Sequence, residues 1–209
     1  MVKRVLIRLF LGVFLFGTLS IVLCAIIGNT VSPESKTRAA QKAKEAKVYC
    51  QQHGMRTDYC FLVDFDVHSG RNRFFIWDFK KESIIYSCIC AHGNGKGSTH
   101  KTPVFSNQPG SNCTSLGRYK VTKTRYMYNI QKKNKVKVPC YELIGLDKTN
   151  SNAHSRGILI HPSVSQWPTY PFHRVFRTNG CFGLPLRGYH KVDEYKKMSE
   201  KTMLLWAYN

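Results

Sequence analysis

The feature that most constrains this chain is an uncharged, apolar run near its N-terminus, from Leu9 to Ile27. As a helix, about 20 such residues rise roughly 30 Å, the thickness of the hydrocarbon core of a bilayer. The run is longer than the apolar core of a signal peptide, which has about 7–15 residues, and no convincing small-residue cleavage site follows it. We therefore expect residues 1–30 to be an uncleaved membrane anchor, with a cleaved signal segment as the alternative.

The next segment, residues 31–57, predicts a helix that links the anchor to the rest of the chain. Ser32 is a favoured N-cap residue, and Pro33 suits the first turn. Ala, Lys and Glu are frequent up to Gly54, which provides a stop. We interpret this helix as a mostly exposed, solvated spacer, which leaves residues 58–209 as the folded domain.

From Tyr59 onward the sequence consists of short runs of β-forming residues bounded by turn residues. Three runs predict an antiparallel meander, at residues 61–66, 73–78 and 83–90. Two longer segments predict a hairpin, at residues 119–130 and 136–146. Near the end, Pro185 is expected to break the chain, residues 192–201 predict a short helix, and residues 203–206 are expected to dock on the sheet. The fold class is therefore mainly β (α+β), with few short helices.

The formal net charge of +20 predicts attraction to anionic phospholipid, anionic wall polymer or nucleic acid. Many of the basic residues lie in the predicted hairpin over residues 119–146. This hairpin lacks any recognised nucleic-acid module, so we interpret it as a solvated charged surface and expect no specific nucleic acid as a partner.

The eight cysteines do not form a metal-binding set, since no CxxC pair occurs. Cys88, Cys90 and His92 alternate along one predicted strand but fall short of a closed zinc site. We interpret the two cysteines as buried strand residues or as half of a disulfide. Four others could pair in an oxidising compartment: Cys50, Cys60, Cys113 and Cys140. No metal or other cofactor is expected.

A nucleophile is indicated by the stretch Thr-Asn-Gly-Cys at residues 178–181. Gly180 can adopt positive φ and bring a backbone N–H close to a substrate carbonyl. A thiol near its free pKa is mostly protonated at neutral pH, so Cys181 needs a base. His161 is the best candidate, because it ends the apolar run 157–160 that predicts a strand. Together the two side chains predict acyl transfer through a thioester.

The order of these residues also matches a known pattern. Sixteen residues separate His161 from Thr178, and Gly180 and Cys181 follow after one more. This resembles the signature of the L,D-transpeptidases, cysteine enzymes that cross-link bacterial peptidoglycan. Five further runs resemble their murein L,D-transpeptidase catalytic domain: Phe105–Asn107, Gly110–Ser111, Thr114–Tyr119, Leu143–Asp147 and Asn150–Gly157. The resemblance covers about residues 59–190 and implies a β-sandwich or barrel catalytic domain after the membrane helix.

Two positions depart from the family pattern. Asn179 stands where many members carry a second histidine, and it can form hydrogen bonds but cannot titrate. Pro162 stands where many members have Gly or Ser. The resemblance implies that the carbonyl of this residue orients the imidazole, and proline retains its carbonyl.

The resemblance implies that Cys181 attacks an L,D peptide bond of a peptidoglycan stem peptide, with His161 accepting the thiol proton. The amides of Gly180 and Cys181 are candidate oxyanion donors. An amine of a second stem then attacks the thioester in cross-linking, whereas water attacks in the L,D-carboxypeptidase alternative. Arg156 is a candidate carboxylate clamp, with a structural ion pair as the alternative. The other candidate substrate-binding residues are Ser115, Thr178 and Asn179.

A peptidoglycan substrate requires the domain to lie outside the membrane, in the periplasm or cell envelope, either anchored or secreted.

The main rival is an inactive, membrane-anchored peptidoglycan-binding protein, which the departure at Asn179 favours. A sortase-like enzyme would have a longer His–Cys separation and an Arg after the Cys, and in papain-like enzymes the Cys precedes the His. Four aromatic residues between His161 and Cys181 are interpreted as loop packing, with a ligand groove as the alternative: Trp167, Tyr170, Phe172 and Phe176.

Overall fold

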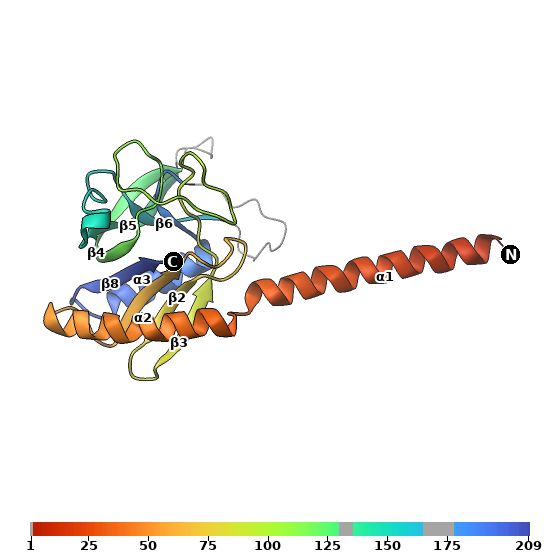
Figure 1. Ribbon diagram of the computed structural model, residues 1–209, viewed down its shortest axis with the longest axis horizontal. Coiled ribbons are helices and arrows are strands. Elements are labelled where there is room, and N and C mark those ends of the chain that lie inside the picture. The colour runs from red at the N-terminus through yellow and green to blue at the C-terminus, as the bar shows by residue number, and fades with distance from the viewer. Residues whose placement is uncertain (1, 130–135, 165–177) are drawn as a thin grey trace.

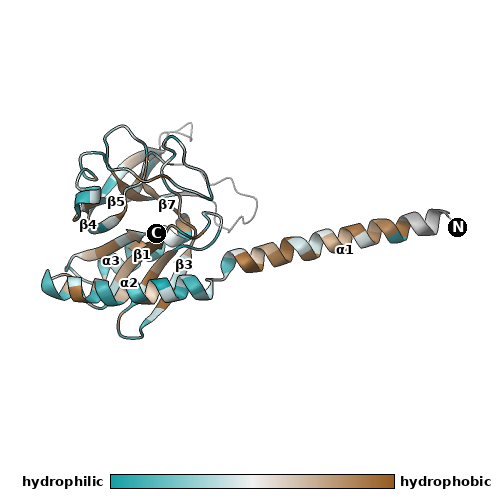
Figure 2. Ribbon diagram, in the orientation of Figure 1, coloured by the Kyte–Doolittle hydropathy of each residue, from teal (hydrophilic) through white to brown (hydrophobic). Residues whose placement is uncertain are grey.

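The computed structural model describes the chain except for residues 1, 130–135 and 165–177 (Figure 1). A long N-terminal helix, α1 (Val2–Asn29), projects away from a domain built on one mixed sheet. The predicted helix over the apolar run is confirmed. The helix is mostly hydrophobic (Figure 2), and its Leu, Ile, Val and Phe side chains from Ile7 to Ile26 are exposed, which is unfavourable in water. By length and composition the helix could cross a membrane.

Helix α2 (Pro33–Gln52) follows after a short break, with the predicted start and stop. The Ser32 hydroxyl accepts a hydrogen bond from the Ser35 amide at 3.3 Å, and Pro33 opens the first turn. Gly54, with a φ of 63°, lies just beyond the last turn, where a left-handed residue commonly terminates a helix.

The interpretation of α2 as a solvated spacer is wrong, because one of its faces packs on the sheet. Ala39, Ala43, Ala46 and Cys50 recur on one side of the helix and are buried against the domain. Their small side chains allow a close approach to the sheet. The fully buried Asp64 anchors the start of the helix by accepting hydrogen bonds from two of its side chains, Ser35 at 2.7 Å and Arg38 at 2.8 Å.

The sheet of the described residues has eight strands in the order β3-β2-β1-β8-β4-β5-β6-β7. Their bounds are β1 (Tyr59–Asp64), β2 (Phe74–Asp78), β3 (Ser83–Cys88), β4 (Gly117–Asn129), β5 (Val136–Gly145), β6 (Leu159–Val164), β7 (Phe182–Pro185) and β8 (Met203–Tyr208). The pairs β1–β8 and β6–β7 are parallel, and the other neighbours are antiparallel. The predicted meander and hairpin are confirmed, and the hairpin turn lies outside the described residues.

The two ends of the sheet approach each other, so that it wraps around the main core. Beyond β3, the Ala91 amide donates to the Gly183 carbonyl at 2.7 Å, and Gly93 forms a bridge with Thr178. Alternate residues of the strands fill the interior, including Phe61, Val63, Tyr119, Leu143, Ile160, Phe182 and Leu205. Cys88 and Cys90 belong to this core, as predicted for buried strand residues.

The C-terminal part differs from the sequence-based expectation in two respects. Helix α3 (Leu186–Lys197) begins directly after Pro185, which occupies its N-cap position instead of interrupting the chain. Strand β8 does not merely dock on the sheet but forms its centre, between β1 and β4. A 3₁₀ turn, η1 (Lys148–Asn150), lies between β5 and β6.

Candidate active site

The strand register brings Cys181 and His161 to the same face of the sheet. In the parallel pair β6–β7, Ile160 is opposite Phe182, and both point into the core. The residues next to them, His161 and Cys181, therefore point to the opposite face. Cys181 is two residues before Gly183, the residue opposite His161, so the two positions are diagonal neighbours. Gly183, opposite His161, has no side chain to fill the intervening space.

The Cys181 thiol is held in its protonated form. Its side chain is half-buried, and Sγ lies 3.6 Å from the Gly157 carbonyl oxygen, to which the S–H donates. Burial raises the pKa of Cys181 to about 11, although a backbone hydrogen bond from Leu159 and the charge of Arg156 oppose the rise. At neutral pH the Cys181 side chain is therefore a neutral thiol.

The pKa of His161 is shifted so that the imidazole is neutral at neutral pH. Its side chain is buried, and burial lowers the pKa of His161 below the usual 6.5. A hydrogen bond with the Pro162 backbone opposes this shift. At neutral pH a neutral imidazole thus accompanies a neutral thiol, an arrangement suited to general-base catalysis rather than to a stable thiolate–imidazolium pair.

Alkylation of Cys181 by iodoacetamide is expected to accelerate about tenfold per pH unit from pH 7 to beyond pH 9, because only the thiolate reacts. A free cysteine peptide should level off near its ordinary pKa of about 8.5. Peptide mass spectrometry of timed samples measures the rate at residue 181. A plateau for Cys181 below pH 9 would contradict the raised pKa.

The turn that carries Cys181 is fixed by Thr178. Gly180 has a φ of 113°, a conformation that strongly favours glycine. Its amide donates to the Thr178 hydroxyl at 3.3 Å, and this hydroxyl donates to the Cys181 carbonyl at 2.6 Å. Thr178 thus holds the turn from within, whereas Asn179 is exposed at its surface. Since the Gly180 amide is engaged inside the turn, the Cys181 amide is the stronger candidate oxyanion donor.

Arg156 and Ser115 hold the segment that supports this turn. Arg156 donates to the carbonyls of Ser106 and Cys113 at 2.8 and 2.5 Å, and to the Ser115 hydroxyl at 2.8 Å. Its bonds therefore go to carbonyls and hydroxyls, not to the acidic partner considered as the alternative. Ser115 is fully buried and donates to the Ser106 carbonyl at 2.9 Å. Both side chains brace the loop beside Gly180, and the prediction that they also bind substrate stays a prediction.

A second support for the turn was not anticipated from the sequence. Arg73 is fully buried and donates to Nδ1 of His92 at 2.7 Å. Since Nδ1 accepts, the ring proton is on Nε2, which donates to the Thr99 carbonyl at 2.9 Å. The His92 carbonyl in turn accepts from the Thr178 amide at 3.1 Å. An arginine in a polar turn region gives no sequence signal for such burial.

Two further expectations concern the surroundings of the site. Among the described residues, no group of three or more His, Cys, Asp or Glu side chains is placed to hold a metal ion. The four aromatic residues of the loop before Thr178 lie within residues 165–177, outside the part of the chain that the structure describes.

Both the sequence and the structure of the chain resemble those of known proteins. Residues 32–208 match a family model described as the L,D-transpeptidase catalytic domain. No curated protein matches the chain. Among solved structures, an L,D-transpeptidase from Stackebrandtia nassauensis has 14% identity and a TM-score of 0.42, over 73% of this chain and 56% of that one. The chain thus spans little more than half the length of that structure.

Two other solved structures are similar at comparable levels. An L,D-transpeptidase from Xylanimonas cellulosilytica has 13% identity and a TM-score of 0.42, over 87% of each chain. A mutant L,D-transpeptidase from Enterococcus faecium has 13% identity and a TM-score of 0.38, over 72% of this chain and 50% of that one.

Proposed function

Because its residues 32–208 match the family model, the chain belongs to the L,D-transpeptidase catalytic domain family, and we propose that it is a cysteine acyltransferase acting on peptidoglycan stem peptides. The observation that carries this proposal is the position of Cys181 and His161 on one face of β6 and β7, within the matched region. The neutral thiol and neutral imidazole have the protonation states that the first step requires.

In the first step, the Cys181 sulfur attacks the carbonyl carbon of an L,D peptide bond while His161 accepts the thiol proton. The carbon–nitrogen bond then breaks, and the imidazolium returns the proton to the leaving amine. The product is a thioester between Cys181 and the donor stem. The hydrogen bond with the Pro162 backbone holds the imidazole in one orientation through both transfers.

The negative charge that develops on the carbonyl oxygen requires donors fixed in advance. The Cys181 amide is the first candidate, and the Gly180 amide can join if it exchanges its long bond to Thr178. One such donor contributes about 2.7–4 kcal/mol in enzymes where it has been removed. The network from Arg156 and His92 stabilises the turn and so keeps these amides in place.

In the second step, an amine of a neighbouring stem attacks the thioester carbonyl carbon, and His161 accepts the amine proton. The carbon–sulfur bond breaks, the imidazolium returns the proton to the Cys181 sulfur, and the new amide bond is the cross-link. If water attacks instead, the product is a shortened stem, and the enzyme is an L,D-carboxypeptidase. We place the catalytic domain outside the membrane, in the periplasm or cell envelope, with α1 as its anchor.

An inactive peptidoglycan-binding protein is the second candidate, and two observations favour it. Asn179 removes a titratable group that many relatives carry, and a Cys181 pKa of about 11 disfavours the reactive thiolate. Such a protein would retain stem-peptide binding through the same surface without forming a thioester.

Mass spectrometry of muropeptides from cells that express the full chain separates these functions. We expect new cross-links between stem peptides in walls digested after expression. Shortened stems without new cross-links would assign the carboxypeptidase reaction. An unchanged profile, with binding to sacculi that survives alkylation of Cys181, would contradict the proposed enzyme and favour the inactive protein.

A further inference from the structure

Asn72 fastens the end of α1 to the domain. The backbone amide of Asn72 donates to the Gly28 carbonyl at 3.2 Å, and its side-chain amide donates to the Asn29 carbonyl at 3.0 Å. The last carbonyls of a helix have no partner within the helix. Asn72, which is buried just before β2, therefore fixes the end of the apolar helix against the domain.

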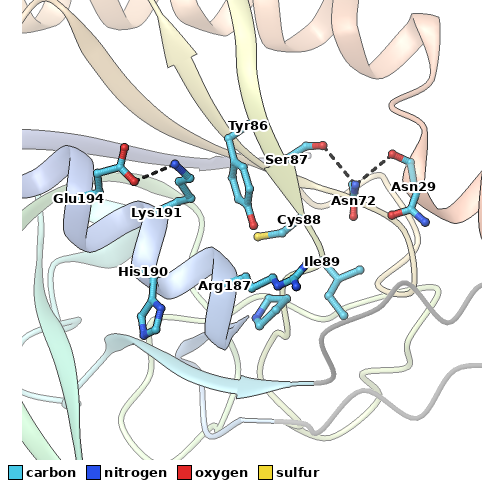
Figure 3. Close-up of a pocket in the computed structure, with 11 residues that line it drawn as sticks. Asn29, Asn72, Tyr86, Ser87, Cys88, Ile89, Arg187, His190, Lys191 and Glu194 are labelled. Carbon is cyan, nitrogen blue, oxygen red and sulfur yellow. Dashed lines mark hydrogen bonds and ion pairs between the residues drawn. The ribbon is translucent and has the colours of Figure 1, made fainter.

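A pocket of about 400 Å³ opens beside this junction (Figure 3). Asn29 and Asn72 line one side, and the first turns of α3 line the other, with the end of β3 between them. Figure 3 shows Tyr86 and Cys88 of β3 close to Arg187 of α3. The pocket thus connects the end of the apolar helix with the catalytic domain.

The charged residues of the pocket favour an anion. Arg187 lines it from the first turn of α3, where the helix dipole is positive, and His190 and Lys191 line it from the second turn. Glu194 is the one carboxylate among the lining residues. Lys191 lies 2.8 Å from Glu194, but both side chains are nearly half exposed, at 44% and 45%. An exposed pair of this kind is weak, so an anionic ligand can compete for Lys191.

The depth of the pocket in the membrane indicates which kind of anion is within its reach. The apolar run ends at Ile27 and, as about 20 helical residues, fills a hydrocarbon layer of roughly 30 Å. Headgroups extend this layer by about 5–7 Å on each side. Asn29, two residues beyond the run, therefore lies among the headgroups, and the pocket that it lines opens at the same level.

We propose that this pocket binds the headgroup phosphate of an anionic phospholipid in the leaflet from which α1 emerges. Arg187 and Lys191 contact the phosphate, and the partly exposed ring of Tyr86 provides apolar surface for the glycerol and upper acyl chain. The bound lipid holds the domain against the membrane in a fixed orientation. This inference rests on the proposed membrane anchoring by α1 but not on the acyl transfer.

Native mass spectrometry of the full chain in neutral detergent tests the site with phosphatidylglycerol and phosphatidylcholine as probes. We expect retention of phosphatidylglycerol but not of phosphatidylcholine. The double variant Arg187→Gln/Lys191→Gln should bind phosphatidylglycerol about 25-fold more weakly, since each basic side chain near an anionic surface contributes about fivefold. The matched control Lys80→Gln/Lys81→Gln, at the exposed β2–β3 turn, should bind as the wild type does.

Three outcomes would overturn the site: equal retention in the double variant and the wild type, equal retention of the two lipids, or complete displacement by inorganic phosphate. If the double variant does not fold, the charge-conserving Arg187→Lys/Lys191→Arg should keep the lipid, and Lys191→Gln alone should lose about fivefold. If the wild-type chain does not float with lipid vesicles, both the membrane anchoring by α1 and the lipid site are refuted. A missing acyl adduct on Cys181 refutes only the proposed enzyme, because lipid retention is measured separately.

Discussion

Replacing Cys181 by alanine is expected to abolish the covalent adduct that the protein forms with a carbapenem, a β-lactam that acylates cysteine nucleophiles. Alanine has no sulfur to form the thioester, and removing a nucleophile lowers the rate by several orders of magnitude. Intact-mass spectrometry measures the adduct directly. The wild type should gain the mass of one carbapenem, and Cys181→Ala should gain none.

The fold should survive this substitution. The Cys181 side chain is half-buried, and its bond to the Gly157 carbonyl is long for a hydrogen bond, at 3.6 Å. Its loss should cost no more than about 1 kcal/mol of the free energy of unfolding.

Cys140 provides the matched control, because it is a buried thiol on β5, the other neighbour of β6. Its thiol donates to the Arg125 carbonyl at 3.2 Å, a structural contact. Cys140→Ala should therefore still form the adduct. An adduct of equal amount in Cys181→Ala would show that another group is acylated.

The candidate pair His161 and Cys181 was predictable because its signal is local. His161 follows an apolar run, and Gly180 and Cys181 are adjacent, so a strand near each residue could be inferred from short patterns. The bounds were less accurate, because β6 begins at Leu159 and continues past His161 to Val164. Spacing and residue types also identified the family. The face that the two side chains share required the pairing of Ile160 with Phe182, which no local pattern specifies.

The strand order was beyond the reach of local patterns for the same reason. β8 pairs with β1 and β4, although it is the last strand in the sequence. Its apolar run indicates burial but does not identify its neighbours. The buried face of α2 was missed because alanine is both the best helix former and an acceptable core residue, so Ala39, Ala43 and Ala46 did not distinguish a spacer from a packed helix.

The supports of the active-site turn were missed because charged residues usually lie at the surface. Arg73 and Arg156 instead satisfy buried carbonyls: Cys90 accepts from Arg73 at 2.8 Å, and Cys113 accepts from Arg156 at 2.5 Å. Burial lowers the pKa of Arg73 to about 10. Arg73 lies outside every run that resembles the family, and only tertiary structure reveals its supporting role, as it does for the bonds of Arg156 to backbone carbonyls.

The turn is the part of the site least able to tolerate a side chain, and Gly180→Ala measures this. Alanine at a φ of 113° is strained, and its Cβ would lie 2.7 Å from the Ile158 side chain and 2.8 Å from the Cys113 carbonyl oxygen. Strain of this type costs about 1–3 kcal/mol, and the contact with a braced backbone adds to it. We expect a loss of about 3 kcal/mol in stability, a fall in melting temperature of about 6–12 °C, and slower acylation of Cys181.

Gly54→Ala separates the cost of backbone strain from the cost of a steric contact with the added methyl group. Gly54 also has positive φ, at 63°, but no atom lies within 4 Å of the position that an alanine methyl group would occupy, so only the backbone penalty of about 1–2 kcal/mol applies. Being remote from Cys181, this variant should acylate at the wild-type rate. Thermal unfolding in detergent and timed intact-mass spectra compare the two variants. If Gly180→Ala unfolds and acylates as Gly54→Ala does, the turn has room for a side chain, and the proposal that its amides are held rigidly beside the nucleophile fails.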